Sequence, residues 1–192
     1  TPIRILRTAS KPGRGLLRAI GWLDQRLLVA MRTRGHNRAS EGVARSLGTF
    51  GELGSGWLAL GVIAAAADPP RRESWFAAGA AGPASVSINY AAKLVIGRER
   101  PLIDEHPMLA RAPSKLSFPS AHSTSAACAA TAMARVEPRL AMPAGALAAA
   151  TCASRPFLGM HYPSDVLAGV VLGTVLGHAW PVETEDKELW AS

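Results

Sequence analysis

Three short clusters in the second half of the chain contain side chains suited to phosphoryl transfer, and the first is a pair of cations. Lys93 and Arg100 are seven residues apart, or about two helical turns, so both are expected on one face at the end of a helix that Pro101 stops. Two cations placed in this way can hold one anion between them. Taken alone, the pair also fits a lysine that extends to a membrane interface and an arginine on the surface.

The second cluster is the sequence Phe118-Pro119-Ser120-Ala121-His122, which opens an apolar segment. Proline is favoured in the first helical turn, and the N–H groups at a helix N-terminus form a ready anion site. His122 would lie within one turn of that site, where an imidazole can donate a proton to a leaving oxygen near neutral pH. A helix cap followed by an interfacial histidine fits the same residues.

The third cluster begins with Ser154-Arg155 and continues with His161 and Asp165 on either side of Pro163. Pro163 marks the start of a helix, so His161 precedes the helix and Asp165 lies in its first turn. The carboxylate can then bond one imidazole nitrogen and leave the other one available as a nucleophile. A nucleophilic imidazole, several cations and a second, proton-donating histidine together make a metal-free phosphoryl-transfer site.

Apolar segments of similar length position these three clusters. Five segments of low charge density are about as long as the roughly 20 residues that cross a bilayer, and all three clusters lie at the same end of them. Ala and Gly replace Leu in these segments, which weakens their hydropathy but lets helix backbones approach closely. We therefore expect an all-α fold, a polytopic membrane bundle of about five transmembrane helices. The segments are approximately 47–67, 74–96, 120–136, 139–158 and 163–181.

Length and composition limit the other possibilities. The 192 residues fit one domain, and with 48% hydrophobic and only 18% charged residues the chain is not intrinsically disordered. Two cysteines exclude a disulfide-stapled mini-protein. A mean hydropathy of +0.13 beside a net charge of +7 requires that apolar and basic residues be segregated along the chain.

The basic residues gather in an N-terminal arm, residues 1–45, which holds ten of the 21 Lys and Arg residues. Within it, Gly15 to Met31 has the pattern of an amphipathic helix that lies on a membrane surface. We expect membrane lipids as its partner and no nucleic acid, since no nucleic-acid-binding module is present. A solvated basic face remains the alternative for Arg4 to Arg14. Residues 46–182 are then the transmembrane domain, and 183–192 form an acidic tail.

The arm also predicts an orientation. If it is cytoplasmic, as basic flanks usually are, successive spans alternate and place loop 97–119 and turn 155–162 on the cytoplasmic face. The three clusters lie in these two connections or at the helix ends beside them. The sequence therefore predicts a multi-pass protein of the plasma membrane with a cytoplasmic site.

In order and spacing, the three clusters resemble the signatures of the type 2 phosphatidic acid phosphatase superfamily. The resemblance implies that His161 forms a phosphohistidine intermediate, that Asp165 supports it and that His122 is the general acid. It implies no metal or other cofactor. The motif matches are K-x6-R-P at Lys93 to Pro101, P-S-G-H at Pro119 to His122 and S-R-x5-H-x3-D at Ser154 to Asp165, and the implied phosphate-binding residues are Lys93, Arg100, Ser120, Ala121 and Arg155.

One position departs from these signatures. Ala121 stands where the family has glycine. The change adds only a methyl group and should leave the backbone N–H available for phosphate, so we expect activity to survive it.

A narrower resemblance concerns the substrate. Three stretches are similar to actinobacterial enzymes that dephosphorylate decaprenylphosphoryl-5-phosphoribose to decaprenylphosphoryl ribose, in the synthesis of precursors of cell-wall arabinan and arabinogalactan. A cytoplasmic site would suit such a lipid-linked substrate. Undecaprenyl diphosphate, phosphatidylglycerol phosphate and phosphatidate are the alternative substrates, and many members that act on the first two have their site on the outer face. The stretches are Phe50-Gly51-Glu52 with Gly56-Trp57-Leu58, Leu116 to His122, and Gly159 to Val166.

Two other classes share part of the pattern. Soluble acid phosphatases and vanadate-dependent haloperoxidases carry the same three signatures, but the apolar segments argue against both. The non-enzymatic alternative is an inactive membrane scaffold. Within the first span, Glu52 is an isolated carboxylate that we expect to pair with a basic residue near the site.

Overall fold

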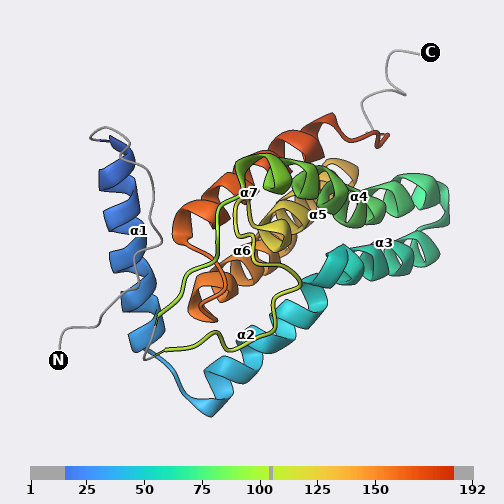
Figure 1. Ribbon diagram of the computed structural model, residues 1–192. Coiled ribbons are helices and arrows are strands. Elements are labelled where there is room, and N and C mark those ends of the chain that lie inside the picture. Colours follow the sequence, from blue (N-terminus) through green and yellow to red (C-terminus); the bar gives the residue numbers. More distant parts are fainter. Residues whose placement is uncertain (1–15, 104–105, 184–192) are drawn as a thin grey trace.

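The computed structural model describes residues 16–103 and 106–183, and this part of the chain is almost entirely helical (Figure 1). A single β-bridge joins Glu99 to Leu116 within it. The helices are α1 (Leu16–Thr33), α2 (Arg38–Gly51), α3 (Ser55–Ala67), α4 (Arg72–Ile96), α5 (Ala121–Val136), α6 (Ala141–Phe157) and α7 (Pro163–Ala179), with the short 3-10 helices η1 (Glu52–Gly54), η2 (Pro69–Arg71) and η3 (Pro138–Leu140).

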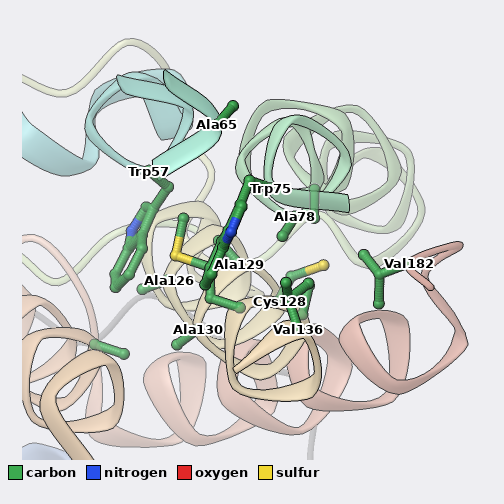
Figure 2. Packing of buried hydrophobic residues seen from close by; sticks show 14 residues of the cluster. Trp57, Ala65, Trp75, Ala78, Ala126, Cys128, Ala129, Ala130, Val136 and Val182 are labelled. Carbon is green, nitrogen blue, oxygen red and sulfur yellow. The ribbon is translucent and has the colours of Figure 1, made fainter. Parts of the chain in front are cut away.

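Helix α5 is the centre of the bundle and packs against α3, α4, α6 and α7 (Figure 1). Its apolar face consists mainly of alanines, which meet two tryptophans, Trp57 of α3 and Trp75 of α4, in the principal core (Figure 2). Small side chains on the central helix and large ones on its neighbours fill the space between closely spaced backbones.

A line of glycines brings α7 into backbone contact with α5. A Cβ atom at Gly169, Gly173 or Gly177 would overlap a carbonyl oxygen of α5. These glycines recur every fourth residue and therefore lie on one face of α7. The start of α7 is consequently fixed against the start of α5. The three carbonyls belong to Ser120, Thr124 and Cys128.

Helices α4, α5, α6 and α7 coincide closely with four of the segments expected from the sequence, and two details of their ends were wrong. The remaining segment, 47–67, is not one helix, because it runs from the end of α2 through η1 into α3, and Leu53 and Gly54 have positive φ at the break. Gly97, in the left-handed conformation with φ 66°, ends α4, so the helix stops four residues before Pro101. Pro119 precedes α5 instead of lying in its first turn, because Ser120 is the N-cap residue and α5 begins at Ala121. In both cases the capping residue decides the helix end.

By length and composition alone, one helical stretch among the described residues could cross a membrane. It is Arg38–Ala67, which joins α2, η1 and α3 and has a mean hydropathy of 1.4 in its best window. Pro163–Ala179 is apolar but shorter. Helices α5, α6 and α7 have 16, 17 and 17 residues and are shorter than that stretch, so the five spans stay a prediction.

Candidate active site

The site lies at the end of the bundle where α5 and α7 begin and where the segment between α4 and α5 folds back over them (Figure 1). The two arms of that segment are paired: Arg100 N–H donates to the Lys115 carbonyl at 3.0 Å, and Ser117 N–H donates to the Arg98 carbonyl at 2.7 Å. The starts of the two helices are joined as well, since Ser120 N–H donates to the Asp165 carbonyl at 2.9 Å.

Lys93 and Arg100 are both buried here, but not as two residues on one helical face. Lys93 lies in the last turn of α4, whereas Arg100 lies beyond the helix in the paired segment. Lys93 Nζ donates to the carbonyls of Leu116 and Ser117 at 3.3 and 3.4 Å. Arg100 Nε donates to the Ser114 carbonyl at 2.8 Å. The predicted cation pair therefore exists through strand-like pairing and not through helical spacing.

His161 is buried, and both of its ring nitrogens face charged groups. Nδ1 lies 3.6 Å from Asp165 Oδ2, at the limit of an ion pair. Nε2 lies 2.9 Å from the Arg100 guanidinium, which also donates to the Met160 carbonyl at 2.8 Å. The Asp165 carboxylate thus faces Nδ1 but lies too far away for the expected hydrogen bond, and Nδ1 has no hydrogen-bond partner among the described residues. The other nitrogen is not free, because its lone pair accepts from Arg100.

Asp165 is fully buried and its two oxygens have separate partners. Oδ1 accepts from Arg98 at 2.8 Å, and Oδ2 accepts from the backbone N–H of Tyr162 at 2.9 Å. The second of these bonds caps the N-terminus of α7, where a carboxylate is favoured by the helix dipole. Asp165 is therefore held in place by backbone and side chain together.

Arg155, near the end of α6, is buried beside the same cluster. Its guanidinium donates to Ser154 Oγ at 2.7 Å and to the Ala44 carbonyl of α2 at 3.3 Å. A Cβ atom at Gly48 would come within 2.7 Å of the guanidinium, so this glycine gives the arginine its room. The contact between α2 and α6 is what places Arg155 in the site.

Ser120 and Ala121 occupy the N-terminus of α5. Ser120 Oγ accepts from the N–H and the hydroxyl of Ser123, at 3.4 and 3.0 Å. Asn89 of α4 is buried against the same turn and donates to Thr124 Oγ1 at 2.9 Å. The first turn of α5 is thereby tied to α4 as well as to α7.

His122 lies on the α2 side of the site. Its Nε2 is 3.1 Å from the Gly48 carbonyl and 3.6 Å from Glu52 Oε2. The isolated carboxylate Glu52 does pair with a basic residue of the site, as expected. A Cβ atom at Gly51 would come within 2.8 Å of the His122 ring, so a second glycine of α2 permits this approach.

A pocket of about 320 Å³ opens beside Arg155 between α2, the segment after Pro107 and the end of α6. Its lining combines cations, a carboxylate and apolar groups. The residues are Arg45, Gly48, Thr49, Glu52, Leu109, Ala110, Arg111, Arg155, Leu158 and Met160.

Burial sets the protonation state of His161. Removal from water lowers its pKa to about 4, and the nearby Asp165 carboxylate opposes part of that shift. The imidazole is therefore neutral at physiological pH. Burial also lowers the pKa of Arg100, while Asp165 and Glu52 raise it; an arginine remains a cation even so.

Two charged residues of the site were missed by the sequence analysis. Arg98 bridges Asp165 to Asp24 of α1, with Nη2 of the arginine 2.8 Å from Asp24 Oδ2. The available signal for Asp24 was that it is an isolated acid in a strongly basic arm. Arg98 is two residues from Arg100, and their spacing alone does not show that Arg98 would contact Asp165 while Arg100 contacts His161.

Within residues 16–103 and 106–183, no three His, Cys, Asp or Glu side chains gather where a metal ion would need them. The acidic residues Asp104 and Glu105, which could also bind a metal ion, lie outside the described residues. The cluster that is present consists of cations around a neutral imidazole, which fits an anion.

Comparison with known proteins agrees with this chemistry. The family model described as the PAP2 superfamily matches residues 74–187. Decaprenylphosphoryl-5-phosphoribose phosphatase of Mycobacterium tuberculosis is 44% identical over 141 residues, which are 70% of this chain and 75% of the relative. The enzyme of that name from Mycolicibacterium smegmatis is also 44% identical, over 66% of this chain and 69% of its own.

Two further similarities are more distant. Undecaprenyl-diphosphatase BcrC of Bacillus subtilis is 34% identical over 52% of each chain. The crystal structure of Aquifex aeolicus LpxE has the same fold, with a TM-score of 0.63 at 20% identity over 82% of this chain and 93% of that one.

Proposed function

The chain belongs to the PAP2 superfamily and is a phosphatase, and from that premise we propose that it removes the 5-phosphate of decaprenylphosphoryl-5-phosphoribose in a membrane. The observation that carries the proposal is the convergence of cations and two histidines from three separate segments on one buried point. The identity of 44% to enzymes named for that substrate supports the choice of lipid.

The proposed reaction starts with the neutral His161. A phosphate oxygen is a stronger acceptor for the Arg100 guanidinium than an imidazole is, so substrate binding draws the guanidinium away from Nε2. Nε2 then attacks phosphorus, a P–N bond forms and the P–O bond to the ribose breaks. His122 gives its proton to the leaving oxygen. The phosphate-binding residues that spread the negative charge are Lys93, Arg100, Ser120, Ala121 and Arg155.

The second half of the reaction returns the site to its starting state. His122, now neutral, takes a proton from water, and the hydroxide attacks phosphorus as the P–N bond breaks. Asp165 faces Nδ1 of His161 and stabilises the positive charge that the ring carries while phosphorylated. Each step uses only side chains of the site and water, so no metal or cofactor is needed.

The pocket beside Arg155 supports a polar head group. Glu52 can accept hydrogen bonds from ribose hydroxyls, and Arg45 and Arg111 offer cations to the second phosphate, the diester that carries the decaprenyl chain. Phosphatidate has neither of these groups. Undecaprenyl diphosphate has the second phosphate but no hydroxyl to satisfy Glu52, whose negative charge would then face an anion. The pocket thus favours the phosphoribose lipid.

Undecaprenyl diphosphate is the second candidate substrate. It is favoured by the 34% identity to BcrC, which is named as an undecaprenyl-diphosphatase. The reaction at phosphorus would be the same.

We propose a multi-pass arrangement in the plasma membrane. Large apolar side chains project outward along α3 and α7, where they suit lipid better than water. On α7 they recur every fourth residue at Leu167, Val171 and Val175, each more than 60% exposed. We place residues 46–182 in the transmembrane phosphatase domain, the basic arm 1–45 with its amphipathic helix on the cytoplasmic surface, and the site on that face.

The substrate is tested by phosphate release from detergent-purified protein. The panel is decaprenylphosphoryl-5-phosphoribose, undecaprenyl diphosphate, phosphatidylglycerol phosphate and phosphatidate, each with and without EDTA, and His161→Ala is the control. We expect kcat/KM to be at least about tenfold higher for the phosphoribose lipid, unchanged by EDTA. A preference for any other lipid would contradict the substrate but keep the reaction.

The orientation is tested by maleimide labelling, since both native cysteines are buried. Lys115→Cys lies at the site end of the bundle and Arg72→Cys at the opposite end, and both positions are exposed. In intact cells an impermeant maleimide should label Arg72→Cys only. Labelling of Lys115→Cys instead would place the site on the outer face.

A further inference from the structure

Helix α1 reaches the catalytic carboxylate through a chain of charges, in which the two carboxylates are buried and the Arg98 side chain between them is 30% exposed. Asp24 of α1 accepts from Arg98 Nη2 at 2.8 Å, and Arg98 Nη1 donates to Asp165 Oδ1 at 2.8 Å. Ser164 closes the ring, because its N–H donates to Asp24 Oδ1 at 2.8 Å and its Oγ accepts from Arg98 at 2.7 Å. Asp24 is 3% exposed and Asp165 is fully buried. The network is therefore anchored on two buried carboxylates.

Other contacts of α1 flank the same region. Leu28, one turn after Asp24, packs in a small core with Ile103 and Tyr162. Arg32, one turn further on, donates to the carbonyls of Phe157 and Pro107 at 3.0 and 2.9 Å. One face of α1 therefore holds both ends of the loop that carries His161.

The network has a direct geometric consequence for His161. Arg98 occupies Oδ1 of Asp165 and Tyr162 N–H donates to Oδ2, which leaves Oδ2 directed at His161 Nδ1. Without the guanidinium, the carboxylate would keep only its backbone partner and could rotate about χ2. Arg98 also stacks over the Tyr162 ring, with its Cζ 4.1 Å from the ring centroid, which restricts the arginine itself.

We propose that Arg98 is a positioning residue, which orients Asp165 toward His161, and that Asp24 of α1 in turn orients Arg98. Helix α1 is then a working part of the phosphatase and not only an attachment to lipid. The inference rests on the proposed function, because it assumes that Asp165 and His161 act together. It concerns the same site and adds the residues that set its geometry.

The test is a mutant cycle measured as phosphate release under saturating and limiting substrate. Arg98→Gln should lower kcat by about tenfold to a hundredfold and leave KM within about twofold, since a small displacement of an orienting group costs that much. Asp24→Asn should lower kcat in the same direction by less. Arg98→Lys should restore part of the loss, because it returns one charge but not the forked geometry.

The decisive arm is the double variant. In an Asp165→Asn background, Arg98→Gln should lower kcat by less than about twofold, because a residue that acts through Asp165 has nothing left to orient. If the double variant instead lost kcat by the product of the two single losses, the proposal would be overturned. Arg26→Gln is the matched control on α1: this exposed arginine lies over Trp22 and should leave kcat unchanged.

Two further outcomes separate this inference from the proposed function. If Arg98→Gln folds, as judged by its thermal transition in detergent, and keeps the wild-type kcat, the inference is wrong while the phosphatase stands. If the wild-type chain prefers another lipid phosphate, the substrate is wrong, and the cycle is measured on that lipid with the same expectations.

Discussion

The two walls of the site are built differently. The inner wall consists of Arg100, His161 and Asp165, all buried, and each of these residues is held by backbone groups or other charges. The outer wall consists of His122, Glu52 and the α2 glycine Gly48. It adjoins the pocket, and the Glu52 side chain is 54% exposed. The difference indicates that the reaction geometry is fixed by packing on one side, while the substrate is selected on the side that stays open.

Removing the nucleophile of the inner wall should have the largest effect. His161→Ala should lower kcat by at least about 10³-fold, because no other side chain can form the covalent intermediate. The fold should be retained. Phosphate release and the thermal transition in detergent measure the two quantities, and a turnover near that of the wild type would remove His161 from the role of nucleophile.

A smaller loss is expected when the inner wall keeps its nucleophile but loses its charge. Asp165→Asn should lower kcat by about 10²-fold, since the amide cannot stabilise a positive imidazole. The variant should still form a phosphohistidine, which is acid-labile and is therefore trapped with alkaline detergent after brief exposure to labelled substrate. Failure to trap any phosphoenzyme, in a variant that folds, would mean that Asp165 does more than support His161.

A substitution in the outer wall should change KM and the preference between lipid substrates. Glu52→Gln should raise KM for the phosphoribose lipid by about threefold to tenfold, because a neutral amide is a weaker acceptor for ribose hydroxyls. Phosphatidate, which has no such hydroxyls, should be hydrolysed at an unchanged or higher kcat/KM. Equal losses on both lipids would instead assign Glu52 to the chemical step through its contact with His122.

The smallest effect concerns pH. Protonation removes the His161 lone pair, and burial lowers the pKa of that ring to about 4. The acidic limb of kcat/KM that belongs to His161 should therefore fall near pH 4 and leave activity within about twofold between pH 7 and pH 5.5. The substrate phosphate also titrates in this range, so its pKa is measured separately and its contribution is subtracted from the kcat/KM profile. A His161 limb near the ordinary value of 6.5 would show that the inner wall is hydrated.

The sequence predicted site residues correctly where a chemically suitable side chain stands next to a recognisable helix start. His161 and Asp165 flank a proline that does begin α7, so their approach was predictable from local geometry. His122 next to the Ser120 cap was predictable for the same reason. Four of the five predicted segments also agree with single helices, whereas 47–67 is divided between α2 and α3.

Long-range pairing was beyond the reach of local patterns. The approach of Arg98 to Asp24 joins residues 74 positions apart. Lys93 and Arg100 were brought together in the prediction for a wrong reason, because Gly97 ends α4 and the bridge between Glu99 and Leu116 sets the position of Arg100. The pocket depends on how α2 lies against the segment after Pro107, which no periodicity encodes.

The glycine line of α7 has a consequence for how such a protein can diverge. Gly169, Gly173 and Gly177 set the separation of α5 and α7 by backbone contact, so the distance between the starts of those helices does not depend on side-chain volume. The outward residues of the same helix, Leu167 and Val171 among them, lie on another face. The outward surface of α7 can therefore change in composition without altering the dimensions of the reaction centre.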